Sequence, residues 1–121
     1  MLLEALIGLL IFSIGILALV AMQSAAISQM RDAQYRSEAS ALTERMMGEL
    51  ILLRDKNATG ASGVISAWQS DVTAALPSGA GAITQTITAL GKEVSIQGTW
   101  RPPGASSDSN HVTFGVLKYN D

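Results

Sequence analysis

Residues 1–30 read MLLEALIGLLIFSIGILALVAMQSAAISQM, and this stretch decides how the chain is built. Its only charged side chain is Glu4, after which 26 uncharged residues follow from Ala5 to Met30. At a rise of about 1.5 Å per residue, a helix of that length extends about 39 Å, more than the ~30 Å hydrocarbon core of a bilayer. The sequence therefore predicts a hydrophobic, membrane-spanning helix over residues 1–27.

Two other structures could contain an apolar stretch at this end of the chain. A buried helix of a soluble protein would need more surrounding chain than the remaining residues supply. A secretory signal peptide would need basic residues before the apolar run and a small-residue cleavage site after it. The run starts at residue 1 with no Lys or Arg before it and exceeds signal-peptide length. We expect a processed product whose N-terminus begins the membrane segment.

The same helix is predicted to continue beyond the apolar stretch. From Ser28 to Leu53 the sequence holds strong helix formers, with no proline and one glycine. Apolar residues recur there at spacings of three and four, which is typical of a helix buried on one side. The sequence predicts one helix over residues 1–53, ended by the run at 55–60. The predicted buried positions are Ala39, Leu42, Met46, Leu50 and Leu53.

The other 68 residues (121 minus 53) predict a small α+β head. Residues 62–76 read as a short helix, and three alternating segments at 82–90, 93–101 and 112–119 predict an antiparallel meander with a turn at Gly91-Lys92. Such a sheet is too small to be stable alone, so we expect the amphipathic half of the long helix to cover it. The predicted head spans residues 28–121. The predicted buried side chains of the short helix are Val64, Ile65, Trp68, Val72 and Leu76, and Val112, Phe114 and Val116 are predicted to form the apolar face of the last strand.

Composition excludes several classes of function. The chain is 48% hydrophobic and 15% charged, which excludes a disordered tail. A net charge of −2 provides no basic face, so no specific nucleic acid is expected as a partner. The absence of cysteine excludes disulfides and thiolate zinc sites, and the single histidine, His111, excludes a multi-histidine metal site. His111 lies near Asp108 but without a nucleophile motif, so we expect no catalytic residues, no cofactor and no enzyme.

The opening residues MLLEALIGLLIFSIGIL resemble the N-terminus of a type IV pilin after removal of its leader. The stretch IFSIGILAL, at residues 11–19, and LTERM, at 42–46, are most similar to PilV-type minor pilins, the type IV pilus modification protein family. The specific match covers about 25 residues, and the head is similar only in its layout. The resemblance implies an N-terminal helix that is first a membrane anchor and then the core of a filament.

The resemblance also implies roles for single residues. Glu4 corresponds to the assembly glutamate of the family, which is the fifth residue of the mature protein. Because it is the fourth here, we expect one mature residue ahead of Met1 or a shifted processing site, so that Met1 or the residue upstream carries N-terminal processing and methylation. Gly8 and Gly15 would serve either close helix packing or local unwinding of the helix. Many pilins close a C-terminal loop with a disulfide, which this chain cannot form.

The function implied is that of a structural subunit of a type IV pilus, inserted in the bacterial inner membrane and assembled into a surface filament for adhesion, twitching motility or DNA uptake. The implied partners are other pilin subunits, a prepilin peptidase and methylase, the inner-membrane assembly machinery, and membrane lipid before assembly. A pseudopilin of type II secretion shares the N-terminal pattern and is the first alternative. A single-pass, membrane-anchored binding protein is a more remote one.

Overall fold

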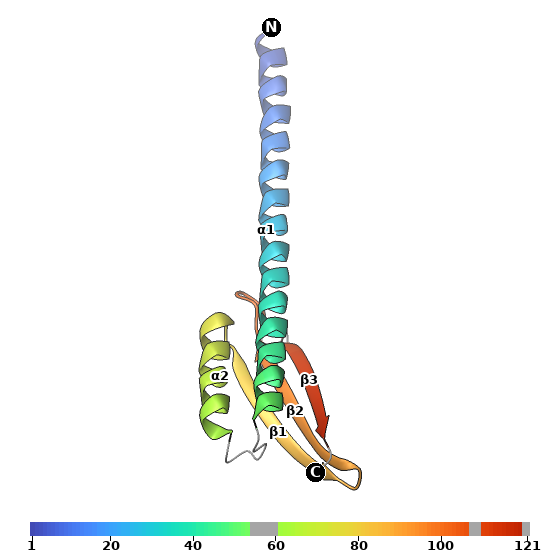
Figure 1. Cartoon of the computed structure of the whole chain (residues 1–121). Helices are drawn as coiled ribbons and strands as arrows, with labels where there is room; N and C mark the ends of the chain where they lie inside the picture. The colour runs from blue at the N-terminus through green and yellow to red at the C-terminus, as the bar shows by residue number, and fades with distance from the viewer. Residues whose placement is uncertain (54–60, 107–109, 120–121) are drawn as a thin grey trace. The chain divides into compact units, whose positions relative to one another are not determined.

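The computed structural model describes residues 1–53, 61–106 and 110–119. Within these residues, two helices precede three strands, as labelled in Figure 1. Contacts divide the chain into two units, Met1–Gln34 and Tyr35–Asp121. The division predicted at residues 27 and 28 stays a prediction. In chain order the elements are α1 (Leu2–Leu52), α2 (Ser62–Ala75), β1 (Ala80–Thr88), β2 (Gly91–Trp100) and β3 (His111–Tyr119).

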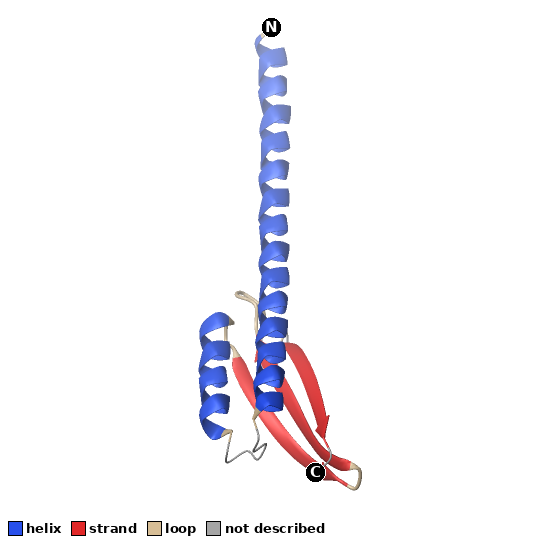
Figure 2. Ribbon diagram, viewed as in Figure 1, coloured by secondary structure: helices blue, strands red, loops and turns tan. Residues whose placement is uncertain are grey.

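The fold is α+β, as the sequence predicts, with a long N-terminal helix packed on a three-stranded antiparallel sheet (Figure 2). The strands form a meander in the order β1-β2-β3, and each pairs with its neighbour in the chain. Ile96 of β2 lies between Ile83 of β1 and Gly115 of β3 in the register. The predicted helix over 1–53 is confirmed to within a residue at each end, and the run at 55–60 lies outside the described residues.

The core of the unit Tyr35–Asp121 lies where both helices cover one face of the sheet. The face of α1 predicted from the spacing is confirmed, since Ala39, Leu42, Met46 and Leu50 are buried. In α2, Trp68 and Val72 are buried, and the Trp68 indole Nε1 donates a hydrogen bond to the Leu42 carbonyl oxygen at 2.9 Å. That bond joins α2 to α1 and satisfies the polar atom of a buried tryptophan.

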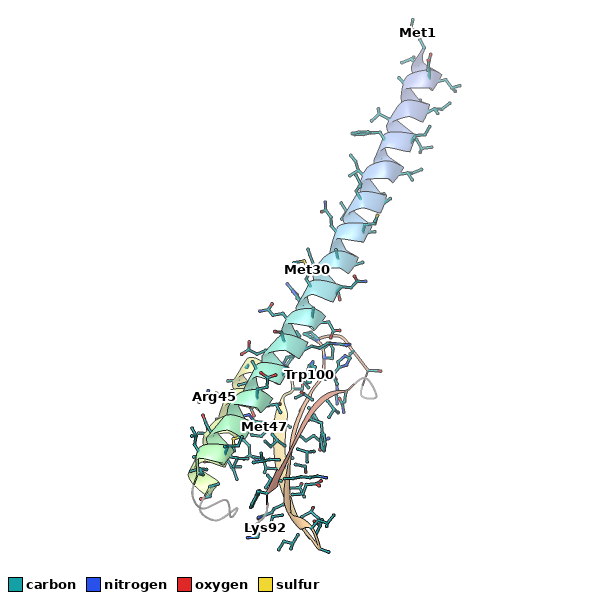
Figure 3. The ribbon with its side chains drawn as sticks, turned by 45° about the vertical axis from the view of Figure 1, so that its right-hand side comes forward. Met1, Met30, Arg45, Met47, Lys92 and Trp100 are labelled. Atoms are coloured by element: carbon teal, nitrogen blue, oxygen red, sulfur yellow. The ribbon has the colours of Figure 1, made fainter. Side chains whose placement is uncertain are left out.

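Glycines on this face of the sheet allow the helices to come close. A Cβ atom added to Gly81 of β1 would lie 2.5 Å from Cζ3 of Trp68. One added to Gly115 of β3 would lie 2.8 Å from Sδ of Met47, a side chain of α1 labelled in Figure 3. Real Cβ atoms do not approach other atoms so closely. The packing of α2 on β1 and of α1 on β3 therefore requires glycine at the contact point in the strand.

Side chains of α1 lie close over Gly115, so the covered face of β3 is not the one predicted. Because side chains alternate between the faces of a strand, Val112, Phe114 and Val116 lie on the face opposite Gly115, away from the helices. Val112 is 52% exposed and Phe114 is 63% exposed. The prediction that these residues form the covered face is therefore wrong. Leu117 and Tyr119 pack against the core instead.

The hairpin between β1 and β2 turns two residues earlier than predicted. Thr88 pairs with Gly91, so the turn consists of Ala89 and Leu90, and Gly91-Lys92 belongs to β2. The Thr88 hydroxyl donates a hydrogen bond to the Gly91 carbonyl oxygen at 2.8 Å. Gly91 has φ of 130°, a conformation open to glycine that other residues rarely adopt. The hairpin therefore needs its glycine at the first residue after the turn, and not within the turn.

We predict that Gly81→Ala destabilises the head by about 1–3 kcal/mol, because the added methyl meets the rigid ring of buried Trp68. Gly115→Ala is the matched control on the same face. There the nearest atom is Sδ of the flexible Met47 side chain, which can move aside, and Cγ2 of Thr43 is 3.0 Å away, so we expect a smaller loss. Urea unfolding of the full chain in detergent, followed by tryptophan fluorescence, measures both. Equal losses of unfolding free energy in the two variants would show that the contact with Trp68 is not the reason why residue 81 must be glycine.

Candidate functional site

Glu4 lies in the first turn of α1, which begins at Leu2. It is exposed and is the only charged residue among the first 30. The free backbone N–H groups of a helix N-terminus favour a nearby negative charge, so the carboxylate is well placed for helix stability. Helix stability alone does not need a carboxylate within an otherwise uncharged stretch, because several neutral residues also begin helices well. Glu4 is thus the one charged side chain that residues 1–30 offer to a partner.

The first half of α1 exposes apolar side chains on every side. All residues from Met1 to Arg31 are exposed. The helix is long and apolar enough to cross a membrane, and none of its most apolar 18-residue window is buried within the chain. A soluble protein rarely leaves so large an apolar surface in water, so this surface belongs in lipid or against other proteins.

Gly8 and Gly15 share one face of α1 with Glu4, since spacings of four and seven residues return to the same side of a helix. No side chain lies within 4 Å of a Cβ atom built at either glycine, so each leaves a hollow in the helix surface. Ser13 lies on the opposite side, and its hydroxyl donates to the Leu9 carbonyl oxygen at 2.7 Å. The helix is continuous through both glycines, and their roles in packing or unwinding stay predictions.

Met1 precedes α1 and is fully exposed. The carbonyl oxygen of Met1 accepts a hydrogen bond from the Ala5 backbone N–H at 3.2 Å. Processing or methylation of Met1, or of a residue upstream, stays a prediction.

Polar side chains of the head form surface ion pairs. The Arg45 guanidinium bonds the Glu49 carboxylate at 3.0 Å and the Asp71 carboxylate at 3.2 Å, joining α1 to α2. The hydrogen bond and charge of Glu49, with a smaller contribution from Asp71, raise the pKa of Arg45 above its ordinary value. All three side chains are well exposed, so these pairs contribute little to stability.

His111 and Trp100 are cross-strand partners with ring centroids 5.5 Å apart. Trp100 is 3% exposed and belongs to the core, as does Trp68, so both predicted core tryptophans are confirmed. Asp108, considered with His111 in the sequence, lies outside the described residues. Among residues 1–53, 61–106 and 110–119, no group of three His, Cys, Asp or Glu side chains is arranged to hold a metal ion.

Two exposed apolar groups in the head were missed by the sequence prediction. Ile87 and Leu90, at the β1–β2 turn, are 77% and 89% exposed. The second group is Val112 and Phe114 on the uncovered face of β3, beside half-buried Val116. A leucine beside a glycine in a turn was a detectable signal for the first group. The second had no such signal, because alternation alone does not say which face of a strand is covered.

Comparison with protein-family models, with curated proteins and with solved structures finds no match to this chain.

Proposed function

We propose that the chain is a structural subunit of a type IV pilus, of the PilV-type minor kind, which polymerises through α1 and displays the head outward. The observation that carries the proposal is the combination found in the first half of α1. A helix exposes apolar side chains from Ala5 to Met30 and has a single carboxylate, Glu4, in its first turn. A plain membrane anchor would need the apolar surface but not the carboxylate.

The proposed role of Glu4 is to pair with the α-ammonium group of a neighbouring subunit. When two opposite charges are transferred together into an apolar filament, their attraction offsets part of the desolvation cost of each. A single charge would bear its full desolvation cost. Because the helix offers one carboxylate at one end, the pair forms at one axial offset between neighbours. The same interaction would therefore select assembly and set its register.

Lipid and neighbouring helices would contact the same apolar surface at successive stages. Before assembly, α1 would cross the inner membrane, after processing by a prepilin peptidase and methylase. The assembly machinery would then transfer it into the filament. Lipid chains are as apolar as leucine side chains, so exchanging one for the other costs little, and close contacts at Gly8 and Gly15 would favour the helix neighbour.

The head buries a core of its own, which supports separate roles for the head and for the apolar half of α1. The buried side chains come from residues 39–50 of α1, from both sides of the α1–α2 contact and from the inner face of the sheet. No buried core residue comes from the unit Met1–Gln34. The apolar half of α1 is thus available for lipid or for other subunits.

We predict that Glu4→Ala and Glu4→Gln both block efficient entry into filaments while the chain still inserts in the membrane. Loss of the carboxylate makes residence in lipid easier. In a filament it would leave the neighbour's α-ammonium buried and unpaired, which costs about 3–5 kcal/mol. The measurement is the amount of each variant in sheared surface filaments relative to the membrane fraction.

Glu4→Gln is the stricter variant, since it keeps the side-chain shape and some hydrogen bonding but removes the charge. If both variants enter filaments at the ratio of the unaltered chain, Glu4 has no role in assembly. If the unaltered chain never appears in surface filaments although the cell makes them, the proposed function itself is wrong, and a secretion pseudopilus becomes the next candidate.

A second prediction concerns topology. We expect the leader to supply positive charge on the cytoplasmic side, which leaves residues 31–121 on the far side of the membrane. A reporter that is active only outside the cytoplasm, fused after Asp121, should then be active. Activity of a cytoplasm-only reporter at the same position would contradict the anchor.

A further inference from the structure

The face of the sheet that points away from the helices is open to solvent. This outer face consists of the even-numbered residues 80–88 of β1 and 112–118 of β3, and of the odd-numbered residues 91–99 of β2. Most of these residues are exposed, and all belong to the unit Tyr35–Asp121. At about 3.4 Å per residue, the nine residues of β1 give the outer face a length of about 30 Å.

Uncharged hydrogen-bonding groups occupy the middle of the outer face. Thr84 and Gln97 are exposed, so a hydroxyl and an amide face the solvent there. The Ser95 hydroxyl donates a hydrogen bond to the Thr84 carbonyl oxygen at 3.4 Å. The Thr99 hydroxyl donates to the Ala80 carbonyl oxygen at 3.3 Å. Both hydroxyl oxygens can still accept a hydrogen bond, so the outer face offers donors and acceptors together.

An exposed aromatic ring lies beside these polar groups. Phe114 is 63% exposed, and its partner in the register is Gln97 of the neighbouring strand. Ala82, the partner of Gln97 on β1, is too small to stand above the sheet next to them. Neighbouring strands are about 4.8 Å apart, so one small ligand can contact the phenyl ring and the amide at once.

The outer face has no net charge. Its only charged residues are Glu93 and Lys118, which pair with each other at 3.3 Å. Nucleic acids and anionic lipid headgroups bind to clusters of unpaired cations, which this face lacks. The charge of the outer face therefore matches a neutral ligand.

The polar groups decide which neutral ligand fits. An aliphatic surface of a protein or a lipid would cover Gln97 and Thr84 without giving their polar atoms a hydrogen-bond partner, which costs free energy. A sugar ring has an apolar C–H face that can stack on an aromatic ring, and hydroxyls at its rim that donate and accept hydrogen bonds. A neutral sugar therefore satisfies both kinds of group on the outer face.

We propose that the outer face binds a neutral polysaccharide, with one sugar ring stacked on Phe114 and the sugar hydroxyls bonded to Gln97 and to the hydroxyls beside it. An extended chain of β-linked sugars lies along the strands and uses the length of the face. This binding goes beyond the proposed pilus function and needs no contact between copies, so a rare subunit can provide it as well as an abundant one.

Binding to insoluble cellulose and to insoluble chitin tests the proposal. The full chain, purified in a detergent without a sugar headgroup, is mixed with each polysaccharide, and the bound fraction is measured after sedimentation. We expect binding to at least one of the two, and added salt should not weaken it because the outer face has no net charge. No binding to either polysaccharide, or binding that salt abolishes, would overturn the proposal.

Phe114→Ala should bind about tenfold more weakly, because it removes the stacking contact. Leu90→Ala is the matched control, since Leu90 is 89% exposed but lies at the β1–β2 turn, outside the outer face. Its binding should be unchanged, and an equal loss in both variants would show general adsorption of exposed apolar groups. Phe114→Trp keeps an aromatic ring and should bind at least as tightly as the unaltered chain, so weaker binding would also contradict the proposal.

Gln97→Leu separates a sugar from an apolar ligand. Leucine is similar in size but has no amide, so the polysaccharide should be bound more weakly, at an unchanged urea midpoint of the head. Binding that stays as tight or becomes tighter would show that the outer face prefers apolar ligands and would refute the sugar. Filaments take no part in these measurements. Failure to bind polysaccharide therefore leaves the pilus function standing, and absence from filaments leaves the polysaccharide site standing.

Discussion

The packing of one face of α1 on the covered face of the sheet is the interaction on which the rest of the head depends. Met46 of α1 and Ile96 of β2 are both fully buried in the shared core. Three short strands with a single apolar face are marginal in water, and covering that face with a helix removes the exposed surface that would otherwise unfold them. The position of α2 follows from this contact, since Trp68 donates its hydrogen bond to a backbone carbonyl of α1 and rests against Gly81 of β1.

One helix therefore carries two kinds of surface. From Ala39 to Leu50 it buries one side against a protein core and shows its polar side to water. From Ala5 to Met22 no side is suited to water. The change occurs without a proline or a break in α1, so the difference lies entirely in which side chains the helix carries. Glu4 stands out against this background because it is the one charged side chain in the apolar half, and its charge costs free energy in any apolar environment that does not pair it.

Most of the fold could be predicted because helices and strands have different periods. Spacings of three and four located the buried face of α1, and alternation located three strands in order. Which face of β3 the helices cover could not be predicted in this way. Residues 112, 114 and 116 look more apolar than 113, 115 and 117, but Gly115 is the residue that a helix can approach, and its importance appears only when Met47 lies above it. For the candidate site, the lone charge of Glu4 was visible in the sequence. The exposure of Ile87 and Leu90 was not, because the turn falls at Ala89-Leu90 rather than at Gly91.

The continuity of α1 has a mechanical consequence. Because one backbone passes through both units, tension applied to the apolar half is transmitted to the head along a ladder of hydrogen bonds parallel to the helix axis. If glycines set the compliance of that path, its softest points are the three glycines of α1, Gly8, Gly15 and Gly48, where no side chain restricts the backbone. Two of the three lie in the apolar half. Under load, local unwinding at Gly8 and Gly15, one of the two roles predicted for them, would lengthen that half before the sheet is disturbed.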